Sequence, residues 1–217
     1  ARDRDFICTE MTASSLTFVM KSSEETLKVY PFAFALKITY TLKEHDLDVC
    51  WEVVNKDSET MYFTIGGHPA FRVPVREGES QSDYRLAFEE QDALTYLLID
   101  TSVGTVIADE PHTLPLENGT CAIDPHMFDK DALVFDNGQI QKAGILFPDG
   151  SPYLTLTSEG FPNFGIWSVP GAPFVCLEPW MGRCDDCGFE KPLSEKANIN
   201  VLKPDEEFIR SYQITVH

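Results

Sequence analysis

Two short segments of the sequence carry residue types that can move protons. His68 lies in the segment 65–71, which reads IGGHPAF, and Glu178 lies in the segment 171–180, which reads GAPFVCLEPW. An imidazole titrates near neutral pH and can act as a general acid or base. A carboxylate that follows apolar strand residues is expected to be desolvated, which raises its pKa toward neutrality. The two segments therefore predict acid–base chemistry.

The residues around His68 are suited to holding a side chain in a fixed place. Gly66 and Gly67 permit unusual backbone angles or the close approach of a ligand, and Pro69 restricts His68 to extended geometry. A structural interpretation stands beside the functional one. His68 could be a structural histidine at a strand end, and Glu178 could cap a loop or pair with Arg183.

A second group of residues could bind a ligand. Trp167 and Trp180 could stack on the apolar face of a sugar ring, and Asp131, at the start of a short apolar strand, is a further ligand candidate. Two carboxylates could also flank a glycosidic bond, so a glycosidase that uses Glu178 and Asp131 stays open at this stage.

No cofactor and no metal are expected. Cys184 and Cys187 form a C-x-x-C pair, but a structural zinc site needs four ligands and the sequence offers one such pair. The sequence contains no glycine-rich phosphate loop and no G-x-S-x-G motif. We read all six cysteines as reduced thiols.

Composition narrows the class of partner. The chain has 217 residues, with 17 basic and 35 acidic side chains and a formal charge of −18. The electrostatic field of this negative charge repels nucleic acids and anionic membranes, whereas it does not act on a neutral sugar. No apolar run is long enough to cross a membrane, and no signal peptide is evident, so we expect a cytoplasmic protein with a small-molecule sugar as partner. A monomer and a homodimer are both compatible with the sequence.

Alternating apolar residues predict strands along most of the chain. The clearest are 32–42 and 47–54, which form a hairpin with residues 47, 49, 51 and 53 on one face. Further strands are predicted at 16–20, 61–65, 85–88, 95–99, 132–135, 143–147, 153–158, 164–167, 174–178 and 208–216. Helical signal is confined to 125–131 and 193–197. The sequence therefore predicts an all-β fold, a large antiparallel β-sandwich in a single domain over residues 1–217.

Four segments together resemble the aldose 1-epimerase, or galactose mutarotase-like, family. They are 66–71 (GGHPAF), 131–137 (DALVFDN), 161–168 (FPNFGIWS) and 173–180 (PFVCLEPW), and they occur in the family's order. The resemblance is strongest to the bacterial mutarotase-like branch and extends over essentially the whole chain. It implies a β-supersandwich and an isomerase that interconverts the anomers of free aldoses without cofactor or metal.

The resemblance also implies roles for individual residues. Glu178 would remove the proton of the anomeric hydroxyl while His68 protonates the ring oxygen, and Asp131 and Arg2 would bind the sugar. We expect His68 and Glu178 to face one cleft, with room for a pyranose between them. The chain begins within the family pattern, so its N-terminal strands and a second cleft histidine are expected to be missing. Arg72 stands where the family pattern has a small polar residue.

The sequence thus favours an aldose 1-epimerase-like isomerase that acts on a free aldohexose. A hexose-6-phosphate 1-epimerase is one alternative, and it would need Arg2 or Arg72 to bind the phosphate. A non-catalytic sugar-binding or regulatory module on the same fold is another. A third alternative is a β-domain in which His68 and Glu178 are structural and lie far apart.

Overall fold

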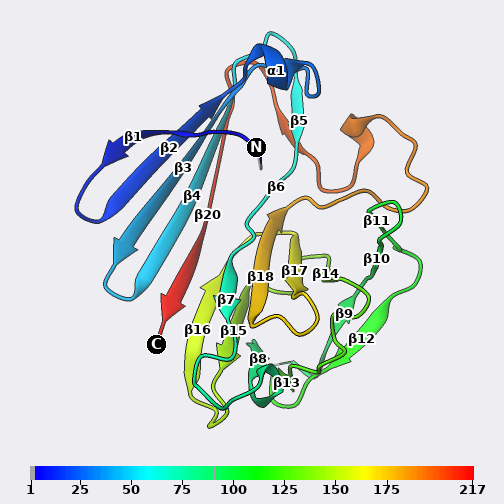
Figure 1. Cartoon of the computed structure of the whole chain (residues 1–217). Helices are drawn as coiled ribbons and strands as arrows, with labels where there is room; N and C mark the ends of the chain where they lie inside the picture. The colour runs from blue at the N-terminus through cyan, green and yellow to red at the C-terminus, as the bar shows by residue number, and fades with distance from the viewer. Residues whose placement is uncertain (1–2, 90) are drawn as a thin grey trace. The chain divides into compact units, whose positions relative to one another are not determined.

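The computed structural model describes residues 3–89 and 91–217, so Arg2 lies outside the described residues. The chain divides into two compact units. The first comprises the described residues up to Phe63 together with residues 200–215, and the second comprises residues 64–199 and the last two residues. Strands make up nearly all the regular structure (Figure 1), and the pairings between them are antiparallel. The prediction of an all-β chain built from antiparallel sheets is confirmed.

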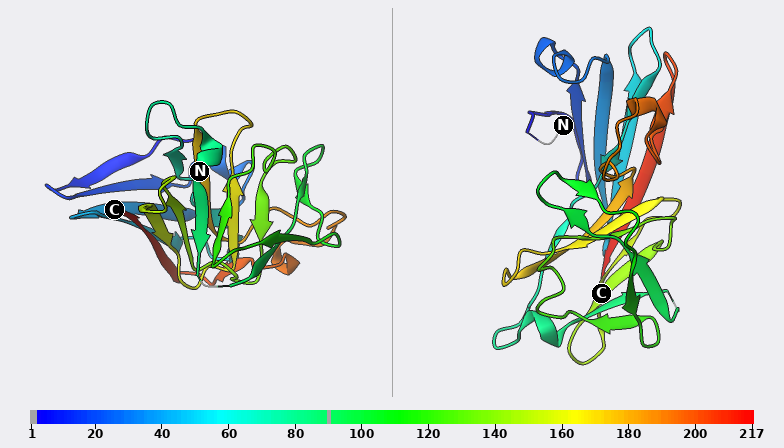
Figure 2. Two further views of the ribbon diagram at one scale, coloured as in Figure 1. Left: turned by 90° about the horizontal axis from the view of Figure 1, so that it is seen from below. Right: turned by 90° about the vertical axis from the view of Figure 1, so that its right-hand side faces the viewer.

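The first unit contains one helix and seven strands among its described residues. They are β1 (Ile7–Met11), β2 (Ser15–Lys21), α1 (Glu24–Leu27), β3 (Phe34–Lys43), β4 (Asp46–Asn55), β5 (Met61–Phe63), β19 (Asn200–Leu202) and β20 (Glu207–Val216). Strands β1, β2, β3, β4 and β20 lie side by side in that order, as the two views in Figure 2 also show. β5 pairs separately with β19.

The hairpin of β3 and β4 forms because its apolar residues alternate. Val49, Trp51 and Val53 are buried along one face of β4, as the period of two predicts. Tyr212 of β20 pairs with Val49 and meets the ring of Trp51 edge to face at a centroid distance of 5.5 Å. The predicted hairpin is confirmed. Helix α1 was not predicted, because a single turn capped by Ser23 carries no periodic apolar signal.

The second unit contains shorter elements. They are β6 (Ile65–Gly66), β7 (Ala70–Arg72), the 3₁₀ turn η1 (Gln81–Asp83), β8 (Arg85–Phe88), β9 (Ala93–Tyr96), β10 (Ile99–Asp100), β11 (Thr105–Val106), β12 (His112–Pro115), β13 (Thr120–Ala122), β14 (Leu133–Phe135), β15 (Lys142–Leu146), β16 (Pro152–Thr157), β17 (Asn163–Trp167), β18 (Phe174–Met181) and the 3₁₀ turn η2 (Leu193–Glu195). Strands β16, β15, β8 and β13 neighbour one another in that order, and β14, β17, β18 and β6 form a second sheet. β7 also pairs with β18.

The central strand β18 has two different faces. Val175 and Leu177 point into the core and are fully buried, and Ile166 of the neighbouring strand β17 lies on the same face. Cys176, Glu178 and Trp180 alternate with the core residues and therefore share the opposite face. One strand thus builds the core with one face and presents ionisable and aromatic groups on the other.

The segment 125–131 was predicted to be helical, and the structure shows that this prediction is wrong. Its backbone N–H groups bond three residues back, from Asp129 to His126 and from Asp131 to Phe128, so that it forms consecutive turns. Asp131 ends the segment with a φ of 74°. Short acids favour such turns because they tolerate the left-handed region. Across the described residues, no helix has the length and apolar character needed to cross a membrane.

Candidate functional site

The backbone of the second unit places His68 opposite Glu178. The N–H of Gly67 donates to the carbonyl of Pro179, and the N–H of Leu177 donates to the carbonyl of Pro69. These two bonds flank His68, which lies between β6 and β7, and Glu178 on β18. The two side chains are therefore brought together by pairing of β6 and β7 with β18, although 110 positions separate them in the chain.

The two side chains are in direct contact. His68 Nδ1 lies 3.3 Å from Glu178 Oε1, and their side-chain exposed fractions are 60% and 5%. The imidazole is thus open to solvent above a buried carboxyl group. The alternative in which His68 and Glu178 lie far apart is wrong, and so is the expectation of room for a pyranose between them.

Burial makes Glu178 an unusually weak acid. Desolvation raises the pKa of its carboxyl group to about 8, the indole N–H of Trp180 opposes this by donating a hydrogen bond, and the negative charge of Asp131 adds to the rise. A carboxylate with a pKa near neutrality is well matched to a general base that works at physiological pH. The sequence predicted the direction of this shift from the apolar residues before Glu178.

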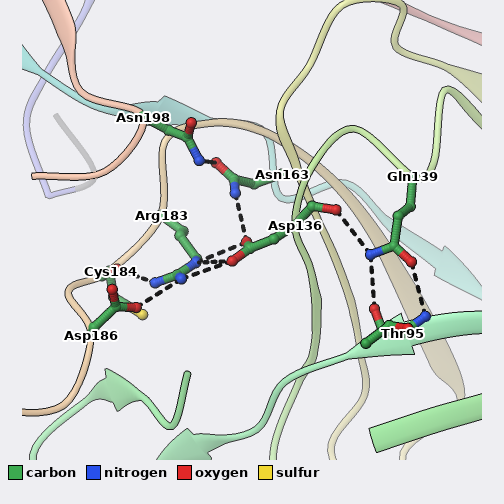
Figure 3. A network of polar contacts seen from close by, with 8 residues as sticks. All are labelled: Thr95, Asp136, Gln139, Asn163, Arg183, Cys184, Asp186 and Asn198. Atoms are coloured by element: carbon green, nitrogen blue, oxygen red, sulfur yellow. Dashed lines mark hydrogen bonds and ion pairs between the residues drawn. The ribbon is translucent and has the colours of Figure 1, made fainter. Parts of the chain in front are cut away.

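Arg183 is not the partner of Glu178, contrary to one interpretation of the sequence. Its guanidinium donates twice to Asp136, from Nε at 2.9 Å and from Nη2 at 2.8 Å, and it pairs with Asp186 at 2.8 Å (Figure 3). Asn163 donates to the same Asp136 carboxylate. Arg183 is almost fully buried, so this network neutralises it. The carboxyl group of Glu178 is left for other chemistry.

Two glycines make room for Trp180. A Cβ atom built on Gly165 would lie 2.4 Å from the outer indole ring, and one built on Gly66 would lie 2.4 Å from Cδ1. Gly165 pairs with Glu178 and Gly66 pairs with Trp180. The indole therefore lies against bare backbone and reaches the carboxyl group of Glu178. In this structure Trp180 positions Glu178, which sequence reasoning had not considered.

We expect Gly165→Ala to disturb the site without touching an ionisable group. The added methyl displaces the indole of Trp180, which should destabilise the fold by about 1–3 kcal/mol, the usual result of overpacking. Thermal unfolding measures this change. Trp180→Phe shortens the side chain and removes the outer ring of the indole, which is the part that Gly165 faces. In that background, Gly165→Ala should lower the free energy of unfolding by less than half as much as it does in the wild type. An equal cost in both backgrounds would contradict the close contact.

Trp167 and Asp131 lie beside the pair. The Trp167 ring meets the His68 ring edge to face at a centroid distance of 5.6 Å, and it also contacts Phe174. Asp131 has left-handed backbone angles and accepts a hydrogen bond from the N–H of Ala132 at 2.7 Å. Its charge acts on Glu178. The structure thus gathers His68, Glu178, Asp131, Trp167 and Trp180 in one region.

Cys176 is a neighbour that sequence reasoning missed. Its sulfur and the ligand atoms of His68 and Glu178 all lie within 4.8 Å of one another. Burial, aided by the charge of Glu178, raises the pKa of the thiol to about 12, so it is protonated at neutral pH. The sequence did contain a signal for this contact, because a residue two positions before Glu178 in a strand points to the same face of the sheet.

Cys184 and Cys187 contact residues of the second unit. All six cysteines are free thiols, as predicted. Cys184 packs against the cluster of Leu97, Val106 and Val134, and the sulfur of Cys187 lies 3.1 Å from Thr105 Oγ1. Cys184 therefore behaves as a small hydrophobic residue.

Comparison with known proteins shows what the chain is similar to. The sequence profile of the family described as aldose 1-epimerase matches residues 1–194. The protein LacX of Lactococcus lactis subsp. lactis is 30% identical over 99% of this chain and 73% of its own length. A galactose mutarotase related enzyme from Lactobacillus acidophilus superposes with a TM-score of 0.91 at 31% identity, over the whole of this chain and 72% of that one. A galactose mutarotase-like protein from Lactobacillus casei gives a TM-score of 0.88 at 29% identity, over the whole of this chain and 74% of that one.

Proposed function

Because this chain belongs to the aldose 1-epimerase family, we propose that it interconverts the α and β anomers of a free aldohexose. The observation that carries the proposal is the contact of the exposed imidazole of His68 with the buried carboxyl group of Glu178, at 3.3 Å. We propose residues 1–217 as one functional domain, since the family match runs through residues of both compact units.

The short distance between the two groups suits the chemistry. The anomeric hydroxyl oxygen and the ring oxygen are bonded to the same carbon, so the groups that serve them must lie close together on one side of the sugar. A pyranose that lay between them would separate them too far. The substrate therefore approaches from the solvent side, over the exposed imidazole.

In the proposed reaction, Glu178 and His68 exchange protons with the sugar, and both residues return to their starting protonation states at the end. The carboxylate of Glu178 removes the proton of the anomeric hydroxyl, and the imidazolium of His68 protonates the ring oxygen as its bond to the anomeric carbon breaks. The product is the open-chain aldehyde. Rotation about the bond from C1 to C2 exposes the other face of the carbonyl, and the reverse proton transfers close the ring as the other anomer.

The neighbouring residues have proposed roles in holding the sugar. Asp131 accepts hydrogen bonds from hydroxyl groups, and Trp167, at the edge of the His68 ring, offers an apolar face for stacking. Trp180 lies against Gly66 and Gly165, so we assign it first to the positioning of Glu178. The role of Arg2 in binding the sugar stays a prediction from the sequence.

Polarimetry of freshly dissolved α-glucose and α-galactose tests the proposal. We expect the optical rotation to reach equilibrium faster with the protein than in buffer, with a chelator present to exclude trace metal. His68→Asn should lower kcat by about 10²-fold or more because the ring oxygen loses its proton donor. His45→Asn, at an exposed turn, is the matched control and should not change the rate. A wild-type rate equal to that of buffer would reject the function.

A further inference from the structure

Three side chains that can bind a metal ion meet on one face of strand β18. Cys176 and Glu178 are two positions apart and therefore point to the same side, and His68 reaches that side from the segment between β6 and β7. The ligand atoms of the three side chains lie within 4.8 Å of one another. Among residues 3–89 and 91–217, no other group of three or more His, Cys, Asp or Glu side chains brings its ligand atoms this close. The proposed proton transfers use the imidazole and the carboxylate and leave the thiol without a role.

The spacing of these atoms is close to that of a tetrahedral zinc site. Zinc bonds of about 2.0–2.3 Å to nitrogen, oxygen and sulfur place neighbouring ligand atoms about 3.3–3.7 Å apart. His68 Nδ1 and Glu178 Oε1 are already 3.3 Å apart. The Cys176 sulfur lies within 4.8 Å of both ligand atoms, so it needs to approach them by about 1 Å at most. Rotation of the Cys176 side chain about its Cα–Cβ bond can supply a movement of this size.

The combination of sulfur, nitrogen and oxygen ligands selects the class of ion. A thiolate together with an imidazole suits zinc and the chemically similar cadmium ion. Magnesium and calcium are instead bound mainly by oxygen ligands. Three protein ligands leave the fourth position of a tetrahedral ion open for water. The site is therefore suited to a zinc ion that exchanges with solution.

A cation has a route to these ligands and is attracted to them. The side chain of His68 is 60% exposed and lies above the carboxyl group of Glu178, so an arriving ion meets the imidazole first. The negative charge of Asp131 acts on the same carboxyl group and favours a cation beside it. The formal charge of −18 on the whole chain adds a long-range attraction.

We propose that His68, Cys176 and Glu178 form a binding site for zinc, and that the bound ion inhibits the chain. The thiol loses its proton to the buffer, and the thiolate supplies both electrons of the zinc–sulfur bond, so nothing is oxidised or reduced. The inhibition rests on the proposed function, because the ion occupies the two groups that exchange protons with the sugar. The binding of zinc does not depend on that function.

Titration with cadmium tests the site, because a cadmium–thiolate bond gives an ultraviolet charge-transfer band. The chain is first treated with a reductant and a chelator and then freed of both. We expect the band that forms with the first equivalent of cadmium to be lost in Cys176→Ala. Cys187→Ala is the matched control, since it removes an exposed thiol outside the site, and it should keep the band. A band that Cys176→Ala keeps, a band that Cys187→Ala loses, or no band in the wild type would overturn the inference.

A second variant leaves the buried thiol in place. His68→Asn changes an exposed side chain and is compared with His45→Asn, at an exposed turn of the first unit. We expect His68→Asn to weaken zinc binding by about tenfold or more, since even the outer partners of metal ligands contribute factors of about 10–100 to affinity. Competition with a chromophoric chelator measures the dissociation constants. Equal constants for the two variants would refute the site.

Polarimetry connects the zinc site with anomer exchange. Zinc should slow the exchange by the wild type, a chelator should restore it, and magnesium should leave it unchanged. Cys176→Ala should exchange anomers within about threefold of the wild-type rate and should need about tenfold more zinc, or a still larger excess, for equal inhibition. Equal inhibition of both proteins would contradict coordination by Cys176. If the wild type exchanges no sugar, the epimerase proposal fails, and the cadmium and zinc titrations still decide about the metal site.

Discussion

We expect Glu178→Gln to lower kcat for anomer exchange by about 10²- to 10⁴-fold, because a general base contributes a factor of that size to the rate. Gln has nearly the same shape and can still accept the hydrogen bond from the Trp180 indole. It cannot take the proton of the anomeric hydroxyl. Polarimetry at neutral pH measures the change, and sugar binding followed by calorimetry should persist because the site keeps its shape.

The matched control is Glu159→Gln, at an exposed turn before β17. It should leave kcat within about twofold, since surface substitutions away from special features have small effects. The melting temperature of Glu178→Gln should equal or exceed that of the wild type, because the neutral amide avoids the desolvation of a buried carboxylate. If Glu178→Gln keeps its activity, the chain is not an acid–base epimerase at this site.

The sequence predicted the parts of the fold that depend on local patterns. Alternation in β3 and β4 gave the hairpin with Trp51 on its buried face, and turn residues such as Asn137 and Gly138 adopt the positive φ angles expected of a turn. Strands β10 and β11 have two residues each and carry no periodic signal. Their existence depends on tertiary pairing, which a single sequence does not encode locally.

For the candidate site, too, the sequence predicted what local patterns specify and missed what depends on pairing between distant segments. His68 and Glu178 could be singled out because glycine, proline and apolar neighbours mark each of them locally. Their separation of 3.3 Å follows from the pairing of β18 with β6 and β7, which no local pattern specifies. The pairing of Arg183 with Asp136, and the approach of the Cys176 sulfur to His68, depend on contacts between distant segments. The residue types indicated the chemistry of the site, whereas the distances between its side chains follow from the fold.

The last expected effect is a change of stability with pH that belongs to Glu178. Its pKa is about 8 in the folded chain and about 4.5 when unfolded. Between these values the folded carboxyl group holds a proton that the unfolded one has lost, so its stabilising contribution is complete below about pH 4.5 and is lost as the pH rises through about 8.

The free energy of unfolding of the wild type should therefore fall relative to that of Glu178→Gln by at most about 1.4 kcal/mol per pH unit, or by about 3–4 kcal/mol from pH 5 to pH 8. Urea titrations of both proteins across this range measure the difference, in which titrating groups away from the site cancel; His68→Asn in both backgrounds removes the imidazole that contacts Glu178. A difference independent of pH would show that the pKa of Glu178 is not raised.

Two neighbours should move this pH dependence in opposite directions. Asp131→Asn removes a negative charge that raises the pKa of Glu178, so the fall in stability should end at a lower pH. Trp180→Phe removes the indole donor that favours the carboxylate, so the fall should continue to a higher pH. Each variant is compared with its own double variant carrying Glu178→Gln. Shifts in the same direction would contradict the assignment, because only opposite shifts follow from one neighbour that repels the carboxylate and one that stabilises it.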